Sequence, residues 1–138
     1  METLSPFFTA WYPRVLGLLR IVTGYLLILH GTAKHLGMPH IEKMASLQPW
    51  SLPWIAGVLE LLGGAMLIAG LFTRPVAFVL SGLMAFAYFI GHASKGTPLL
   101  PLLNGGELAV LYCFLFLFLS VAGGGAWSVD SIIKRRNT

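Results

Sequence analysis

The sequence predicts an all-α integral membrane protein, folded as a four-helix up-down bundle. Hydrophobic residues make up 57% of the 138-residue chain, charged residues make up 10%, and the mean hydropathy is +0.80. Soluble domains have roughly 45–50% apolar and about 25% charged residues. A helix that crosses a bilayer needs about 20 apolar residues. The chain can therefore supply four crossings, with little length left for a soluble domain.

Four apolar segments define the expected crossings. Glycines, prolines and charged residues separate them, as is typical of the connections between helices. We expect one domain over residues 1–138, with spans at about residues 13–37, 53–72, 75–92 and 102–121.

The first span is expected to begin at Pro13, because proline is tolerated in the first turn of a helix. A cleavable signal peptide is the competing interpretation of this segment. The apolar stretch is longer than that of a signal peptide, contains Arg20 and lacks a small-residue cleavage site. We therefore interpret it as a membrane helix.

The connections between the spans differ in length. Residues 38–52 are expected to form a short interfacial segment with an aromatic belt. It has apolar residues at helical spacing beside two tryptophans: Ile41, Met44 and Ala45, with Trp50 and Trp54. The string Thr73-Arg74-Pro75 is expected to form a tight turn between the second and third spans.

The basic residues predict the orientation of the chain. An even number of spans places both termini on one side, and basic residues are enriched on the cytoplasmic side of membrane proteins. The prediction is a multi-pass protein of a bacterial-type inner membrane with both termini in the cytoplasm. Five basic residues lie on the side of the termini and three on the other: Arg14, Arg74, Lys134, Arg135 and Arg136, against Lys34, Lys43 and Lys95.

Each of the first three spans carries its polar residues on one helical face, because side chains advance by 100° per residue. Arg20, His30 and Lys34 share a face with three glycines in the first span. Glu60 shares a face with glycines in the second span, and His92 lies on one polar face of the third. Small residues let membrane helices approach closely. These faces are therefore predicted to point into the bundle.

The polar residues are predicted to converge in the extracytoplasmic half of the bundle. Alternating helix directions bring together the end of the first span, the start of the second, the end of the third and the start of the fourth. Ionisable residues inside a membrane are costly and mark a functional site by default. The cluster is either a ligand-binding or proton-handling pocket or a self-neutralising structural network. Its predicted members are His30, Lys34, Glu60, His92, Asn104 and Glu107.

Arg20 and Arg74 are interpreted as structural charges. Arg20 lies nearer the cytoplasmic half, and two interactions are open to it. It pairs with Glu60 across the interior, or it extends to the inner interface beside Arg14. Cys113 is the single cysteine of the chain, so no intrachain disulfide can form.

No metal site is expected. The di-iron pattern of helical bundles needs Glu-x-x-His, which neither Glu60 nor Glu107 provides. A haem held by His30 and His92 is geometrically conceivable but disfavoured, since histidines in apolar helices are commoner than haem ligands. The basic residues lie where topology requires them, so nucleic-acid binding has no support. We expect no permanently bound cofactor.

Four motifs follow one another along nearly the whole chain. They are Arg20-x3-Gly24-x6-Gly31-x2-Lys34, then Glu60-x2-Gly63-Gly64-x5-Gly70-x3-Arg74, then Asn104-Gly105-Gly106-Glu107-x-Ala109, and finally Gly123-Gly124-Gly125-Ala126-Trp127-Ser128-Val129-Asp130. In their order and spacing, the chain resembles the DoxX family of membrane proteins. It departs from the pattern in its first loop, which is unusually rich in proline and tryptophan around Gln48-Pro49-Trp50.

The resemblance implies a four-helix inner-membrane protein linked to respiratory and oxidative-stress chemistry. The family is named for a small subunit of a terminal quinol oxidase. Relatives are associated with thiosulfate:quinone oxidoreduction, membrane-bound oxidoreductase complexes and resistance to quinone-like compounds. The implied partners are the lipid bilayer and a membrane oxidoreductase. A homo-oligomer is an alternative that the sequence leaves open.

Three functions from different classes follow. The first is a subunit of a quinone-linked redox or detoxification system, in which the bundle admits a small aromatic or quinone-like ring and His92, Glu60 and Glu107 bond its oxygens or exchange protons. The sequence has no electron carrier of its own, so any enzyme activity would require a partner oxidoreductase. The second is a non-catalytic structural or assembly subunit. The third is a proton-coupled small-molecule transporter.

Overall fold

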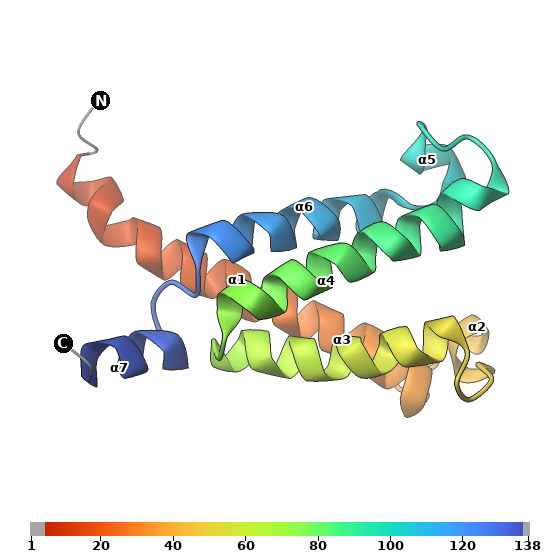
Figure 1. The fold of residues 1–138 in the computed structure, drawn as a ribbon, viewed down its shortest axis with the longest axis horizontal. Coiled ribbons are helices and arrows are strands. Elements are labelled where there is room, and N and C mark those ends of the chain that lie inside the picture. Colours follow the sequence, from red (N-terminus) through yellow and green to blue (C-terminus); the bar gives the residue numbers. More distant parts are fainter. Residues whose placement is uncertain (1–4, 137–138) are drawn as a thin grey trace.

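The computed structural model describes residues 5–136, and this part of the chain contains helices and no strands. The prediction of an all-α membrane protein is confirmed. The expected single domain also includes residues 1–4 and 137–138, which lie outside the described residues. The helices are α1 (Pro6–His35), α2 (Glu42–Ala45), α3 (Leu52–Ala69), α4 (Thr73–Ala87), the π-helix η1 (Tyr88–His92), the 3₁₀ helix η2 (Ala93–Lys95), α5 (Pro101–Asn104), α6 (Glu107–Ala122) and α7 (Val129–Arg136) (Figure 1).

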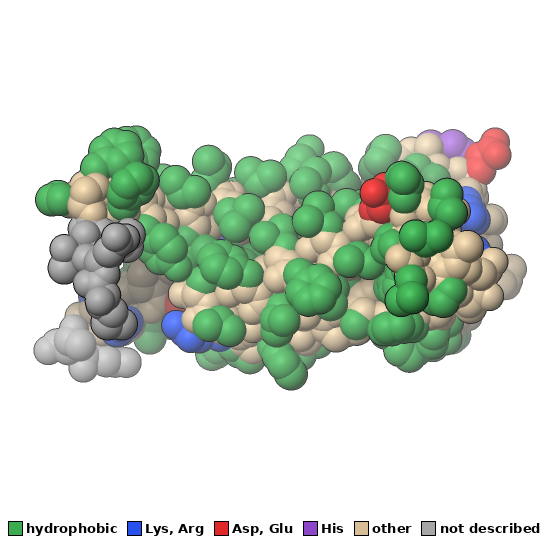
Figure 2. Space-filling model, turned by 90° about the horizontal axis from the view of Figure 1, so that it is seen from above, with side chains coloured by type: hydrophobic (Ala, Val, Ile, Leu, Met, Phe, Trp, Pro, Cys, Tyr) green, Lys and Arg blue, Asp and Glu red, His purple; other side chains and the backbone are tan. Residues whose placement is uncertain are grey.

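The four long helices pack as two pairs, α1 with α3 and α4 with α6. The segments Pro6–His35, Leu52–Ala69 and Thr73–Lys95 are long and apolar enough to cross a membrane. The apolar helix α6 is shorter, at 16 residues. Exposed apolar side chains cover much of the face shown in Figure 2, as expected for a surface in contact with lipid.

The first helix begins earlier than predicted. Pro6 occupies its first turn, and Pro13 lies inside the helix, so the predicted start at Pro13 is wrong. A proline inside a helix removes one backbone hydrogen bond but does not always end the helix. The Pro13 carbonyl accepts a hydrogen bond from the Ala126 backbone N–H at 2.7 Å. The segment before Pro13 is exposed and projects beyond the bundle (Figure 1).

The turn between α3 and α4 lies three residues before the predicted one. Gly70 and Phe72 have left-handed backbone conformations, with φ of 68° and 48°. Both carboxylate oxygens of Asp130 accept hydrogen bonds from backbone N–H groups, one from Phe72 and one from Thr73, each at 2.8 Å. This carboxylate caps the start of α4. The string Thr73-Arg74-Pro75 therefore forms the first turn of α4 and not the turn between α3 and α4.

The glycine faces point into the bundle, as the periodicity predicted. A Cβ atom on Gly24 would lie 2.8 Å from the carbonyl oxygen of Gly64, and a Cβ on Gly64 would lie 2.8 Å from that of Gly24. This close backbone approach holds α1 against α3. The second pair meets the first through larger side chains, including the fully buried Leu67 and Phe116.

The predicted fourth span is broken in two. Gly105 adopts φ of 71° after α5, and α6 begins at Glu107. The Asn104 side-chain oxygen accepts a hydrogen bond from the Gly106 N–H at 2.9 Å, which stabilises the turn. A continuous helix from residue 102, as expected from the apolar run, is therefore wrong.

Candidate functional site

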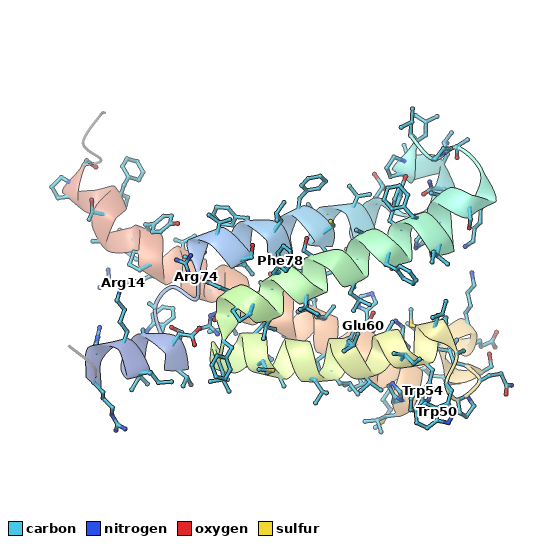
Figure 3. All side chains as sticks on the ribbon, in the orientation of Figure 1. Arg14, Trp50, Trp54, Glu60, Arg74 and Phe78 are labelled. Atoms are coloured by element: carbon cyan, nitrogen blue, oxygen red, sulfur yellow. The ribbon has the colours of Figure 1, made fainter. Side chains whose placement is uncertain are left out.

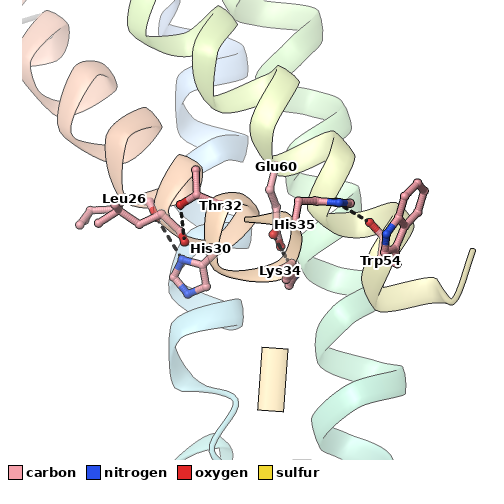
Figure 4. A network of polar contacts seen from close by, with 8 residues as sticks. Leu26, His30, Thr32, Lys34, His35, Trp54 and Glu60 are labelled. Atoms are coloured by element: carbon pink, nitrogen blue, oxygen red, sulfur yellow. Dashed lines mark hydrogen bonds and ion pairs between the residues drawn. The ribbon is translucent and has the colours of Figure 1, made fainter. Parts of the chain in front are cut away.

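An ion pair joins the end of α1 to the first half of α3 (Figure 4). The Lys34 Nζ donates to both carboxylate oxygens of Glu60, at 2.7 and 2.8 Å. The Lys34 side chain is 12% exposed and the Glu60 side chain 6% exposed. Burying two charges costs several kcal/mol of desolvation per ion, so such a pair is weak evidence for a role in stability alone. It places two charges inside an otherwise apolar part of the bundle.

The helical segment after α4 presents His92 toward the same region. Its Nδ1 donates to the Asn104 carbonyl oxygen at 3.2 Å, because a carbonyl can only accept. The Nε2 atom is then an acceptor in the neutral ring and a donor in the charged ring. His92 ends η1, and π-helical turns occur frequently at functional sites.

Tyr88 and Asn104 hold the connection between η1 and α5. The Tyr88 hydroxyl donates to the Pro98 carbonyl at 2.7 Å and accepts from the Asn104 Nδ2 at 3.2 Å. The rings of Tyr88 and His92 are nearly parallel, with centroids 6.5 Å apart. Asn104 therefore positions the site through its neighbours, and its own side chain does not line the cavity described next.

A cavity of about 260 Å³ lies between the two helix pairs. It brings together four of the six residues that the sequence predicted. Its lining also includes apolar side chains and the ring of Tyr112, which meets the His30 ring edge-on at 6.3 Å. The lining residues are Leu27, His30, Lys34, Met44, Glu60, Met84, Ala87, His92, Gly105, Leu108, Ala109 and Tyr112.

Glu107 does not join this cluster, and the prediction of its convergence is wrong. It is exposed and lines a surface groove on the outer side of α6, beside Leu100 and Leu102. The prediction assumed one continuous helix through residue 104. The chain instead breaks at residues 105–106, so the side chains of α6 point in directions that the periodicity of a continuous helix does not give. In the first turn of α6, the carboxylate is also favoured by the helix dipole.

Arg20 contacts neither Glu60 nor the interface, so both predicted interactions are wrong. The side chain is completely buried, and its guanidinium donates to five backbone carbonyls. These contacts join α1 to the end of α3 and to the loop before α7. The acceptors are Leu67, Ile68 at 2.7 Å, Gly124 at 2.8 Å, Ala126 at 3.3 Å and Trp127 at 3.0 Å.

Arg74 lies far from the cavity, at the opposite end of the molecule. Figure 3 shows Arg14 and Arg74 toward one end, Trp50 and Trp54 toward the other, and Glu60 between them. Arg74 is exposed on the first turn of α4 and lines a surface depression with Asp130.

Two residues that line the cavity were not predicted as members of the site. Tyr112 was not among the predicted site residues, yet it is buried and lines the cavity. The residue could have been placed from the sequence only with the correct start of α6 at Glu107, which sets the face that Tyr112 occupies. Met44 lies in α2, within the predicted interfacial segment, and also lines the cavity. Within residues 5–136, no group of three His, Cys, Asp or Glu side chains is placed to hold a metal ion.

Comparison with known proteins identifies the family. Residues 15–93, which include most of α1 and all of α3 and α4, match the DoxX family model. The chain belongs to the DoxX family. Among its relatives, an uncharacterized protein of Haemophilus influenzae is 48% identical over 134 residues, covering 95% of this chain and 94% of the relative.

Two further relatives are more distant. A second uncharacterized protein of Haemophilus influenzae is 33% identical over 91 residues, covering 65% of this DoxX-family chain and 59% of the relative. A Bacillus subtilis protein named "Putative oxidoreductase CatD" is 28% identical over 118 residues, covering 84% of each chain. No solved structure matches the chain.

Proposed function

We propose that this DoxX-family protein is an inner-membrane subunit of a quinone-linked redox or detoxification system. Its bundle cavity binds a small aromatic or quinone-like ligand. The observation that carries the proposal is the buried Lys34–Glu60 ion pair, which lines an otherwise largely apolar cavity together with His92. Both termini lie in the cytoplasm, and the cavity lies in the extracytoplasmic half of the membrane.

The donors and acceptors suit a ring that carries oxygen atoms. Lys34 is a donor, Glu60 is an acceptor, and His92 is either according to its charge. A quinone oxygen accepts from Lys34 or His92, while a phenol or catechol hydroxyl donates to Glu60. Apolar side chains such as Leu27 and Met84 contact the ring faces. Ligand pockets commonly combine a mostly apolar lining with a few convergent polar groups.

A partner oxidoreductase supplies the electrons. Conversion of a quinone to a quinol takes up two electrons and two protons, and this chain's contribution is to hold the ring and to pass protons to its oxygens through His92 and Glu60. The name of the Bacillus subtilis relative supports a link to oxidoreductases.

Thermal unfolding with a panel of quinones and catechols tests the proposal. A ligand that binds only the folded state stabilises it, by about 2.7 kcal/mol at a concentration of 100 Kd. We expect at least one compound of the panel to raise the Tm of the wild type and of Glu107→Gln, but not the Tm of Glu60→Gln. The two substitutions remove the same charge, and only Glu60 lines the cavity, so Glu107→Gln is the matched control.

A non-catalytic structural role is the second candidate, because Lys34 already occupies both carboxylate oxygens of Glu60. In that case no ring changes the Tm, and Glu60→Gln lowers the yield of folded protein. This pair of results would contradict the ligand site and favour a structural subunit.

A further inference from the structure

A second and larger cavity lies between α3 and α4. The two helices meet at the short turn of residues 70–72 and diverge toward their other ends (Figure 1). The cavity between the diverging ends has a volume of about 580 Å³, within the range of roughly 300–1,000 Å³ that is typical of small-molecule sites. Its lining is Lys34, Leu52, Pro53, Ile55, Ala56, Leu59, Glu60, Leu83, Phe86, Ala87, Ile90, Gly91 and His92.

The second cavity adjoins the first at its polar groups. Lys34, Glu60 and His92 line both cavities. The rest of the second lining is apolar apart from backbone atoms. The ion pair and the imidazole therefore lie between a smaller cavity and a larger, more apolar one.

The walls of the second cavity also reach the lipid-facing surface. Ile55, Phe86 and Ile90 line the cavity and are 41%, 50% and 49% exposed. All three lie on helices that are expected to cross the bilayer. A molecule dissolved in the acyl-chain layer can reach the cavity from the side, without passing through water.

We propose that the second cavity holds the apolar tail of a ligand whose ring lies at the ion pair. The ligand class is an amphiphile that comes from the bilayer: a ring with two oxygen atoms that carries an alkyl or isoprenoid chain. The inference rests on the proposed function, because the ring occupies the site described above. It adds that the natural ligand is a lipid-soluble, tailed ring rather than a small soluble catechol.

Gly91 gives a direct way to block the tail without touching the ring. It lines only the larger cavity, and a Cβ atom on it would meet no atom within 4 Å. A leucine at this position therefore extends into space instead of clashing with the protein. Gly82 is the matched control, because a Cβ there also meets no atom and Gly82 lines neither cavity.

The experiment measures binding of two probes to the protein in lipid nanodiscs. One probe is a bare dimethoxy-methyl-benzoquinone, and the other is the same ring with a decyl chain. We expect Gly91→Leu to weaken binding of the decyl probe by at least about tenfold, the equivalent of about 1.4 kcal/mol. Binding of the bare ring should stay within about twofold, and Gly82→Leu should change neither.

A second variant and a second readout distinguish a blocked tail site from a misfolded variant. Ala56→Leu narrows the same cavity from α3 and should show the same selectivity. A decyl probe with a diazirine at the end of its chain should label residues 55–59 and 83–91 in the wild type, and lose this labelling in Gly91→Leu.

The possible failures are distinguishable. If the wild type binds both probes, and the variants either weaken the binding of both probes equally or change neither, the tail site is wrong. The proposed ring site then stands. If the chain labels other helices, the tail site is also wrong. If neither ring binds to the wild type, the proposed function fails and the tail inference fails with it.

Discussion

Lys34 and Glu60 meet where the glycine face of α1 lies against that of α3. A Cβ atom on Gly57 would lie 3.0 Å from the Lys34 Cδ, and a Cβ on Gly31 would lie 3.0 Å from the Gly57 carbonyl oxygen. The absence of side chains at these two positions lets the helices approach closely enough for the lysine to reach both carboxylate oxygens. Packing and charge pairing therefore depend on the same glycines.

Lys34→Met is expected to lower the free energy of unfolding by about 3–5 kcal/mol, because Glu60 then remains buried without its cation. The double variant Lys34→Met, Glu60→Leu should recover most of this loss, since an apolar pair needs no desolvation. Unfolding of the detergent-purified proteins measures both values. Equal losses in the single and double variants would show that the pair does not act as a unit.

Arg20→Lys is expected to destabilise the protein by about 3 kcal/mol or more, although the charge is kept. An ammonium group cannot reproduce the planar set of donors that serves five carbonyls. Arg14→Lys is the matched control, because Arg14 is exposed and donates to one carbonyl, that of Ala10. It should change the free energy of unfolding by less than about 0.5 kcal/mol. A tolerated Arg20→Lys would contradict this account of the guanidinium.

Asp130→Ala is expected to cost about 0.5–2 kcal/mol, the usual effect of removing a helix cap. The substitution leaves the N–H groups of Phe72 and Thr73 without their acceptor. Asp130→Asn should cost less, because its side-chain oxygen still accepts one of the two hydrogen bonds. Thermal unfolding of the wild type, Asp130→Asn and Asp130→Ala measures their order of stability. If Asp130→Asn is as destabilised as Asp130→Ala, the charge rather than the hydrogen bonds stabilises the turn.

The helical faces could be predicted from the sequence, because a period of 3.6 residues fixes which side chains share a side. Glycines at that spacing correctly placed Lys34 and Glu60 in the interior. The position of His92 beside them followed from the alternating helix directions. These inferences needed only the helix geometry and the high cost of charge in lipid.

The interactions of Arg20 and Glu107 could not be predicted in the same way. The partners of Arg20 are backbone carbonyls, which every residue carries, so no residue type marks them in the sequence. The orientation of Glu107 depends on a two-glycine break that resets the helical face. A periodic pattern read across such a break assigns the wrong side to each residue after it.

The orientation of the chain in the membrane gives the last prediction. Five basic residues on the side of the termini against three on the other predict cytoplasmic termini. In a Cys113→Ser background, Ile41→Cys and Ile133→Cys place one exposed thiol on each side without changing the charge bias. In intact cells, a membrane-impermeant maleimide should label position 41 and leave position 133 unlabelled until the cells are opened. The reverse pattern would place the ion pair and both cavities in the cytoplasmic half, so that ligands of the bundle would meet partners on that side.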